Sequence, residues 1–321
     1  MNWRPCAGTS RKPRARVNAA IRRFFARRGV LEVETPVLSG GAPLDPGVES
    51  WCASAPGGAS GYLQTSPEYP MKRLLADGSG DIYQIARVFR GEERGRRHNP
   101  EFTLLEWYRQ GYDDGRLMDE VLDLVQAVAA EDRAWARPVG TATRVAYAEL
   151  FRGELGLDPL TCSAVQCARA AHEAGLELTG NLDRDGWLDA LMALVLAPRF
   201  PRDRLTFIVD YPESQAILAR SNPRAVGYAS RFELYWGDLE LANGFHELTD
   251  PAVFLKRREA DRARRERQEQ PIPEADEYFA QAMQSGLPDC SGVALGIDRL
   301  LMRLLDVDDI TGVIDFPWGR A

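Results

Sequence analysis

The stretch ARVFRGEERGRRHNPEFTLLEWY, residues 86–108, decides the fold of this chain. Alternating apolar residues predict a strand that ends at Phe89 and Arg90, and a second strand is predicted over 101–108. The loop between them is densely charged and closes at Pro100. Because an arginine side chain can donate two hydrogen bonds to a pair of phosphate oxygens, the charged loop predicts a triphosphate-binding site. A solvated charged loop is the competing interpretation.

Length and composition bound the class of protein. The chain has 321 residues, 45% hydrophobic and 27% charged, as in a soluble globular protein with an ample core. No apolar run is long enough for a membrane span, and no apolar segment follows the basic N-terminus as in a signal peptide. The five scattered cysteines lack CxxC spacing, which predicts reduced thiols in the cytoplasm and no zinc site. The net charge of −7 argues against nonspecific nucleic-acid binding.

The segments before the charged loop predict a mixture of helix and loop. Residues 1–16 are predicted to form a flexible lead, and an amphipathic helix is predicted over 17–28. Residues 39–60 are rich in glycine, proline, serine and alanine, which predicts a mobile loop. A strand is predicted over 62–65. Ser66-Pro67-Glu68 then predicts a helix start, with the helix ending near Gly78.

The segments after the charged loop add helices and one further hairpin. Residues 150–200 predict a mostly helical insertion packed on the core. The other predicted elements are helices over 116–130 and 251–268, a strand over 205–209, a hairpin over 231–247 around Gly237-Asp238, and a strand and helix over 292–305 joined at Gly296. A single catalytic domain over 17–321 is the simplest organisation.

Three features could together build a nucleotide site. The first is Arg90 with its charged loop. The second is the pair Glu233 and Glu240, because two carboxylates on adjacent strands can share a magnesium ion. The third is GVALGIDR, which places Arg299 in the first turn of a helix, where anions are favoured. Taken singly, each also fits a structural role, such as an ion pair between Arg90 and Glu93 or a solvated position for the others.

Together these motifs resemble those of the class II aminoacyl-tRNA synthetases. The helix and strand ending at Pro36, the FRxEE…RHNPEFT segment and the GxxxGxDR ending resemble motifs 1, 2 and 3. The chain is most similar to the lysyl branch, on TSPE (65–68), FRGEERGRRHNPEFTLLEWY (89–108) and ELANGFHEL (240–248). The resemblance starts at Val17. It implies an α+β fold, an antiparallel sheet flanked by helices, and a homodimer formed through motif 1.

One element of the lysyl-tRNA synthetases is missing. Motif 1 begins at about Val17, which leaves no room for their N-terminal anticodon-binding domain. In this the chain resembles the elongation factor P lysine ligases, which use ATP and magnesium to activate (R)-β-lysine and transfer it to a lysine of elongation factor P. The resemblance implies a protein acceptor rather than tRNA. A stand-alone lysyl-tRNA synthetase-like enzyme and a catalytically inactive regulatory paralogue are the alternatives.

The resemblance also assigns roles by position. Arg90 and Arg299 match the catalytic arginines, which hold phosphates and, for Arg90, the substrate carboxylate. Glu233 and Glu240 match the magnesium ligands. The ATP-binding positions are Arg90, Glu92, His98, Asn99, Phe102, Glu240, Leu241, Gly296 and Arg299. The substrate-binding positions are Ser66, Glu68, Glu106, Tyr108, Asn243, Phe245, Glu247 and Ala294. The acids of this set suit substrate ammonium groups, which need strong acceptors on leaving water.

Two positions depart from the lysyl-tRNA synthetase pattern. Gly91 stands where motif 2 usually has Asn or Asp, which removes no charge. Ala294 stands where motif 3 usually has Gly. The added methyl would disfavour an α-amino acid and suit an amine displaced by one carbon, with discrimination of about 1–3 kcal/mol. The basic loop residues Arg94, Arg96 and Arg97 are expected to contact an acidic surface of the acceptor protein.

Overall fold

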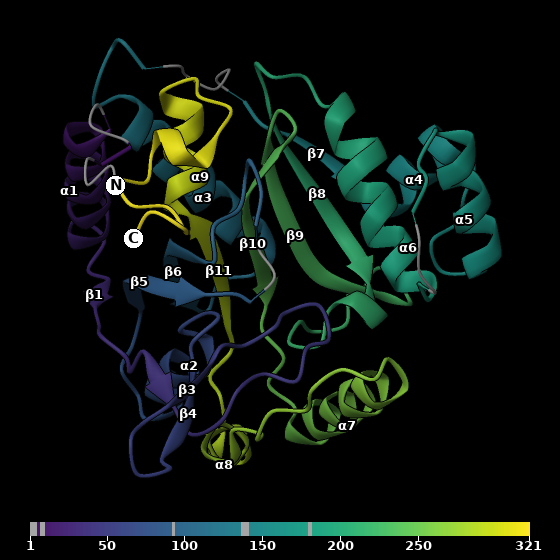
Figure 1. The fold of residues 1–321 in the computed structure, drawn as a ribbon, viewed down its shortest axis with the longest axis horizontal. Coiled ribbons are helices and arrows are strands. Elements are labelled where there is room, and N and C mark those ends of the chain that lie inside the picture. The colour runs from purple at the N-terminus through teal and green to yellow at the C-terminus, as the bar shows by residue number, and fades with distance from the viewer. Residues whose placement is uncertain (1–4, 7–9, 92–93, 136–140, 179–181) are drawn as a thin grey trace.

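An eight-stranded sheet forms the centre of the molecule in this computed structural model, which describes residues 5–6, 10–91, 94–135, 141–178 and 182–321. Its strand order is β1-β5-β6-β11-β10-β9-β8-β7, and only β1 and β7 at the two edges pair in parallel. The strands are β1 (Leu31–Glu32), β5 (Ile82–Phe89), β6 (Glu101–Gln110), β7 (Thr143–Ala146), β8 (Leu205–Pro212), β9 (Tyr228–Trp236), β10 (Leu239–His246) and β11 (Cys290–Gly296). The predicted antiparallel α+β sheet flanked by helices is therefore confirmed (Figure 1).

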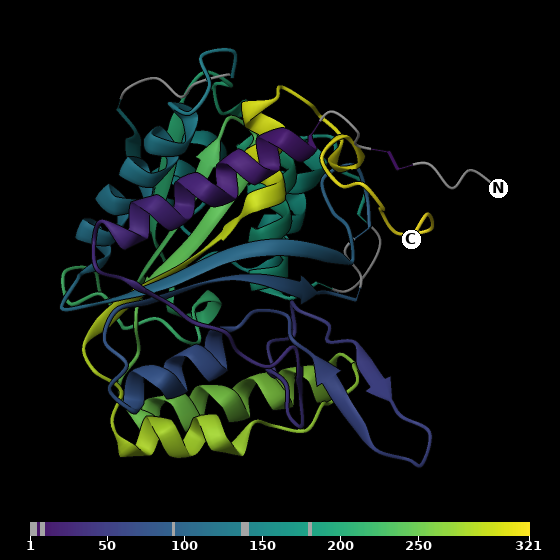
Figure 2. The ribbon, with the colours of Figure 1, turned by 90° about the vertical axis from the view of Figure 1, so that its left-hand side faces the viewer.

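Helices cover both faces of this sheet (Figure 2). On one face α1 (Arg11–Ala26), α3 (Asp114–Ala129) and α9 (Ile297–Leu304) bury the main hydrophobic core. On the other face α2 (Glu68–Ala76), α7 (Pro251–Arg267) and α8 (Glu277–Ser285) bury a second, smaller core. Among the described residues, none of the helices has the length and apolar character needed to cross a membrane.

The two hairpins that carry the charged motifs form as predicted. Strand β5 pairs with β6 along its whole length, from Ile82 opposite Tyr108 to Phe89 opposite Glu101. Strands β9 and β10 turn at Gly237, whose φ of 58° favours glycine. A bulge shifts the β9–β10 register between Glu240 and Ala242. The predicted junction at Gly296 is also present, because β11 ends there and α9 begins at the next residue.

The segment predicted as a helical insertion packs against the sheet near its β7 edge. It contains α4 (Tyr147–Leu155), α5 (Ala164–Glu173) and α6 (Arg184–Leu191), followed by one π-helical turn. These helices share a core of their own with residues of β8 and β9. The insertion therefore packs on the sheet beside the site-bearing strands (Figure 1).

The predicted flexible lead is partly wrong, because α1 begins at Arg11 rather than at Val17. The extra turns carry arginines that find acidic partners near the C-terminus. Arg11 donates to Asp315 at 2.9 Å, and Arg14 pairs with the buried Asp298. Those partners lie far away in sequence, so the helix start could not be inferred from local pattern.

The segment 39–60 contains structure that its composition did not predict. Strands β2 (Leu38–Ser39), β3 (Cys52–Ser54) and β4 (Ser60–Leu63) form a small separate sheet. The segment is also fastened by the buried Arg265 of α7, which donates to main-chain carbonyls at 2.7–3.0 Å. A long-range anchor of this kind leaves no trace in local sequence.

Candidate active site

A cavity of about 650 Å³ lies between the sheet, the small β2–β4 sheet and helices α2, α6 and α7. Every described residue of the predicted site set lines it. Glu92 also belongs to the predicted set, but it lies outside the described residues. The cavity has two chemically different ends, which are called here the nucleotide end and the amino-acid end.

Arg299 is the centre of the nucleotide end. Its guanidinium donates to the carboxylate of Glu240 at 3.2 Å and to the carbonyl of the same residue at 3.1 Å. It also contacts Nε2 of His98 at 2.8 Å. The first turn of α9 thus joins the charged loop to strand β10 in one polar cluster facing the cavity.

Arg90 completes this end from the tip of β5. Its guanidinium lies 5.1 Å from the centre of the Phe102 ring, and its Nε lies 3.4 Å from the Thr65 carbonyl oxygen. Cation–π contact stabilises the guanidinium over the face of the ring. Phe102 in turn offers an aromatic face at the site where the resemblance places adenine.

Asn99, which the resemblance assigns to ATP, lines the cavity and also makes hydrogen bonds within the protein. Its amide nitrogen donates to the Glu101 carbonyl at 2.6 Å, and its amide oxygen accepts the Trp318 N–H at 2.8 Å. Both polar atoms of the side chain thus have protein partners. In this structure Asn99 supports the charged loop from beneath.

Glu233 and Glu240 face the cavity from neighbouring strands. Glu233 pairs with Arg231 and accepts hydroxyl hydrogen bonds from Tyr211 at 2.6 Å and Tyr235 at 2.7 Å. Burial and the negative charge of Glu233 raise the pKa of Glu240. A cation would relieve that repulsion.

The donor set suits magnesium shared with phosphates better than a cage made by the protein alone. Within the described part of the chain, no three His, Cys, Asp or Glu side chains are placed so that together they could hold a metal ion. Magnesium is usually held by one or two carboxylates together with substrate phosphates and water. Glu233 and Glu240 supply that minimum beside the cluster of Arg299.

The amino-acid end is built around the buried carboxylate of Glu106. One oxygen accepts a hydrogen bond from the Tyr108 hydroxyl and the other from the Ser66 hydroxyl, both at 2.6 Å. Ser66 also accepts the N–H of Glu68 at 3.0 Å, so the start of α2 is tied to the same carboxylate. Burial, and then the charge of Glu68, raise the pKa of Glu106 to about 7.

Lys72 is a residue of this end that sequence reasoning missed. Its ammonium lies 2.6 Å from an oxygen of Glu68 and 2.6 Å from an oxygen of Glu247. Burial raises the pKa of Glu247 to about 8, although Lys72 opposes the shift. The missed signal was spacing, because Glu68 and Lys72 stand four residues apart on a helix whose apolar stripe includes Met71 and Leu75.

Strands β10 and β11 form the floor of the amino-acid end. Asn243 lies opposite Ala294, and Phe245 lies opposite Gly292. A side chain at Gly292 would overlap the Tyr108 ring and come within 2.5 Å of a Glu247 oxygen. Gly292 was also missed, since the need for glycine arises only from this close approach.

Arg97, one of the three loop arginines expected to contact an acceptor, also has a partner within the protein. It lines the cavity and pairs with Asp238, which also pairs with Arg303. Its side chain remains partly exposed. Arg94 and Arg96 are exposed, and the Arg94 guanidinium lies 5.2 Å from the centre of the Trp318 ring.

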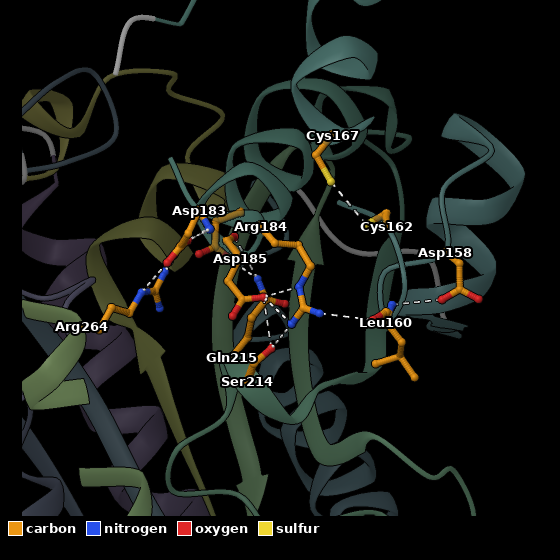
Figure 3. A network of polar contacts seen from close by, with 12 residues as sticks. Asp158, Leu160, Cys162, Cys167, Asp183, Arg184, Asp185, Ser214, Gln215 and Arg264 are labelled. Carbon is orange, nitrogen blue, oxygen red and sulfur yellow. Dashed lines mark hydrogen bonds and ion pairs between the residues drawn. The ribbon is translucent and has the colours of Figure 1, made fainter. Parts of the chain in front are cut away.

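The wall opposite the charged loop is held by a polar network (Figure 3). Arg184 of α6 donates to the Leu160 carbonyl at 3.2 Å and to the Ser214 hydroxyl at 2.9 Å. Arg264 of α7 pairs with Asp183 at 2.8 Å. The network fixes the insertion against the loop after β8 and so defines that side of the cavity.

Comparison with known proteins agrees with this geometry. The family model described as tRNA synthetases class II (D, K and N) matches residues 7–320. A protein of Yersinia enterocolitica named elongation factor P–(R)-beta-lysine ligase is 46% identical over 328 residues, which cover 100% of this chain and 98% of that protein. Proteins with the same name are 45% identical in Vibrio parahaemolyticus, covering 100% and 99%, and 44% identical in Haemophilus influenzae, covering 100% and 98%.

Proposed function

The chain belongs to the class II tRNA synthetase family, and from that premise we propose that it activates (R)-β-lysine with ATP and transfers it to a lysine of elongation factor P. The name and full-length coverage of its relatives support the proposal. The observation that carries it is a single cavity with arginines at one end and three carboxylates at the other. That arrangement suits a triphosphate beside a diamino acid.

The first step forms an adenylate. A carboxylate oxygen of β-lysine bonds to the α-phosphorus of ATP, the bond from that phosphorus to its β-side bridging oxygen breaks, and pyrophosphate leaves. The attacking carboxylate is already ionised, so Arg90 and Arg299 act by positioning and by neutralising charge rather than by moving a proton. Glu233 and Glu240 would hold a magnesium ion, which when bound supplies positive charge to phosphate oxygens.

The amino-acid end would select the substrate by its two ammonium groups. Glu68 would receive the ammonium nearer the carboxylate, and Glu106 and Glu247 the one at the far end. The methyl of Ala294 lies on β11 opposite Asn243 and lines the cavity. It would favour the amine displaced by one carbon in β-lysine over that of α-lysine.

The second step forms an amide. The acceptor lysine amine, once deprotonated, bonds to the activated carbonyl carbon, and the bond to the phosphate oxygen breaks to release AMP. An acceptor must therefore reach the carbonyl from outside the cavity. The exposed residues Arg94 and Arg96 supply positive charge for an acidic surface around that lysine.

Intact-mass analysis of elongation factor P tests the proposal. The factor is incubated with this protein, ATP, magnesium and either β-lysine or α-lysine. We expect a mass gain of one lysyl residue, and we expect more of the factor to be modified with β-lysine than with α-lysine. The variant Ala294→Gly should reduce this preference for β-lysine over α-lysine by about tenfold. No gain while pyrophosphate exchange continues would redirect the search to tRNA as acceptor. Absence of exchange as well would favour an inactive paralogue.

The proposal includes a homodimer formed through the region after α1. Three apolar side chains there support it: Leu31 is 55% exposed, Val37 42% and Leu38 54%. Burial of such a patch in an interface is favourable. Light scattering should give twice the chain mass, and Leu38→Glu should reduce it.

A cytoplasmic location also belongs to the proposal. All five cysteines are free thiols, including the buried pair Cys162 and Cys167, whose sulfurs lie 3.3 Å apart. Free thiols so close together suit a reducing compartment. Fractionation of cells that produce the protein would test the location.

A further inference from the structure

The amino-acid end contains a cation of its own among its acids. Lys72 and Glu247 are each 1% exposed and Glu106 is 2% exposed, while Glu68 borders the open cavity. Buried charges of one sign are costly unless an opposite charge lies beside them. Lys72 is placed 2.6 Å from two of the three carboxylates, from below the cavity floor.

Glu247 is incompletely satisfied even with this lysine. Its two carboxylate oxygens are buried and receive no hydrogen bond from any described residue, the Lys72 ion pair apart. Such a buried carboxylate needs a donor or a cation. Glu247 lines the cavity, where a bound ligand can supply such a donor or cation.

The other titratable groups packed around these acids are neutral. Burial raises the pKa of the Tyr108 hydroxyl on β6 and of the Cys290 thiol on β11, and the nearby glutamates raise both further. The charged groups facing Glu247 are therefore Lys72 and Glu68 from α2 and Glu106 from β6. With all acids ionised, this set carries two net negative charges.

We propose that Lys72 is a resident counter-cation that leaves the amino-acid end with two net negative charges once its three glutamates are ionised, the complement of a substrate bearing two ammonium groups. The inference rests on the proposed function, because it takes a diamino acid as the substrate. Lys72 acts through Glu68 and Glu247, so it is a positioning residue that also sets charge specificity. The substrate carboxylate is matched separately by Arg90 at the nucleotide end.

The alternative arrangement without Lys72 shows what the lysine does. Three unopposed carboxylates would hold protons more tightly, since neighbouring like charges disfavour ionisation. A substrate ammonium would then have to displace a proton before it could bind. Lys72 keeps the acids ionised at lower pH and holds Glu68 and Glu247 at a fixed separation.

The main test is Lys72→Met, measured by β-lysine-dependent exchange of pyrophosphate into ATP between pH 6.5 and 9. We expect the KM for β-lysine to rise at least about tenfold at pH 7. For each acid that must lose a proton before the substrate binds, the KM rises up to about tenfold for every pH unit below the pKa of that acid. The defect should shrink towards pH 9, and the KM for ATP should stay within about twofold. Lys256→Met on α7 removes an exposed lysine and is the matched control.

Lys72→Arg and the pH profile separate charge from structure. Lys72→Arg keeps the charge, so its KM for β-lysine should follow the wild-type dependence on pH even if its value is higher. A Lys72→Met defect of equal size at every pH, or an equal rise in the KM for ATP, would overturn the inference. Failure of the wild-type protein to use or bind β-lysine would instead overturn the proposed function.

Calorimetry of the wild-type protein keeps the inference testable if Lys72→Met does not fold. Binding at pH 7 is measured in buffers of different ionisation enthalpy, with β-lysine and with 6-aminohexanoate, which lacks the amine near the carboxylate. We expect both ligands to release protons, because both carry the far ammonium that meets Glu106 and Glu247, and we expect β-lysine to bind about a hundredfold more tightly. Equal affinity for the two ligands would show that two negative charges are not what the pocket offers.

Discussion

The two ends of the cavity manage charge in opposite ways. At the nucleotide end, Arg299 and Glu240 are partly exposed and already pair with each other, and the charged loop borders solvent. At the amino-acid end, Glu106, Glu247 and Lys72 are almost wholly buried and acids outnumber the lysine. One end is balanced and open, whereas the other is unbalanced and closed.

This difference in charge balance and burial determines how each end can recognise its ligand. A balanced, open cluster exchanges one ion pair for another when a phosphate arrives, so it binds strongly with limited selectivity among phosphates. A closed end with excess negative charge rejects any ligand that leaves an acid unpaired, because a buried unpaired acid is costly. Selectivity for the amino acid should therefore lie with the buried acids.

The largest effect is expected from removing the Arg299 side chain at the nucleotide end. Arg299→Ala removes the guanidinium that joins the charged loop to Glu240 and lines the cavity. Pyrophosphate exchange should fall by about 10²–10³-fold, as when one preorganised donor is removed from an active site. Arg87→Ala is the matched control, since Arg87 is an exposed arginine of β5 paired with Glu101. Comparable losses in both variants would mean that Arg299 acts only on stability.

A second prediction compares the effect of one added methyl group at each end of the cavity. Gly292→Ala places a carbon against Tyr108 and 2.5 Å from a Glu247 oxygen, whereas Gly296→Ala places one 3.7 Å from Arg299, an ordinary contact. We expect kcat/KM for β-lysine to fall about 100-fold in Gly292→Ala, since overpacking costs 1–3 kcal/mol. Gly296→Ala should stay within about threefold.

The KM for ATP locates the effect of Gly292→Ala. It should remain near the wild-type value, because the nucleotide end lies at the other end of the cavity. An equal loss for β-lysine and ATP would show that the substitution disturbs the whole sheet. In that case the two ends could not be treated as separate.

The nucleotide end could be predicted from sequence because its residues lie in contiguous motifs. Arg90, His98 and Phe102 fall within one loop and its flanking strands, and Arg299 falls at a readable strand-to-helix junction. The geometry of these elements follows from strand periodicity and helix starts. In the structure, all of the described residues predicted for the nucleotide end line one cavity.

The amino-acid end was only half predictable. Its glutamates stood out as acids in apolar strands, but Lys72 sits in KRLL, which looks like the surface of a helix. Its role appears only when Glu247 folds against it. Gly292 and the pairing of Arg97 with Asp238 were missed for the same reason, since each depends on a contact between distant segments.

The third prediction uses pH to sharpen the contrast. The raised pKa values, about 7 for Glu106 and about 8 for Glu247, mean that both acids are mostly protonated below about pH 6 in the free protein. An ammonium group binds the ionised form, so the KM for β-lysine should rise as pH falls and level off above pH 8. The slope should reach about tenfold per unit for each proton.

The KM for ATP serves as the internal reference for this profile. It should change much less over the same range, because ATP does not contact the titrating acids. Glu106→Gln should remove the part of the β-lysine profile near pH 7 while weakening binding overall. A β-lysine profile that is flat from pH 6 to 9 would contradict the raised pKa values.

The smallest expected effect lies outside both ends, in the exposed part of the charged loop. The double variant Arg94→Glu/Arg96→Glu reverses two exposed charges and leaves the Arg97–Asp238 pair intact. Transfer to elongation factor P should fall about three- to tenfold at low salt, because surface charges act mainly on the rate of association and are screened by ions. Pyrophosphate exchange should be unchanged, since neither end of the cavity is altered. Equal losses in exchange and transfer would assign the two arginines to the nucleotide end, whereas a transfer defect that persists at high salt would point to a close contact with the acceptor rather than long-range attraction.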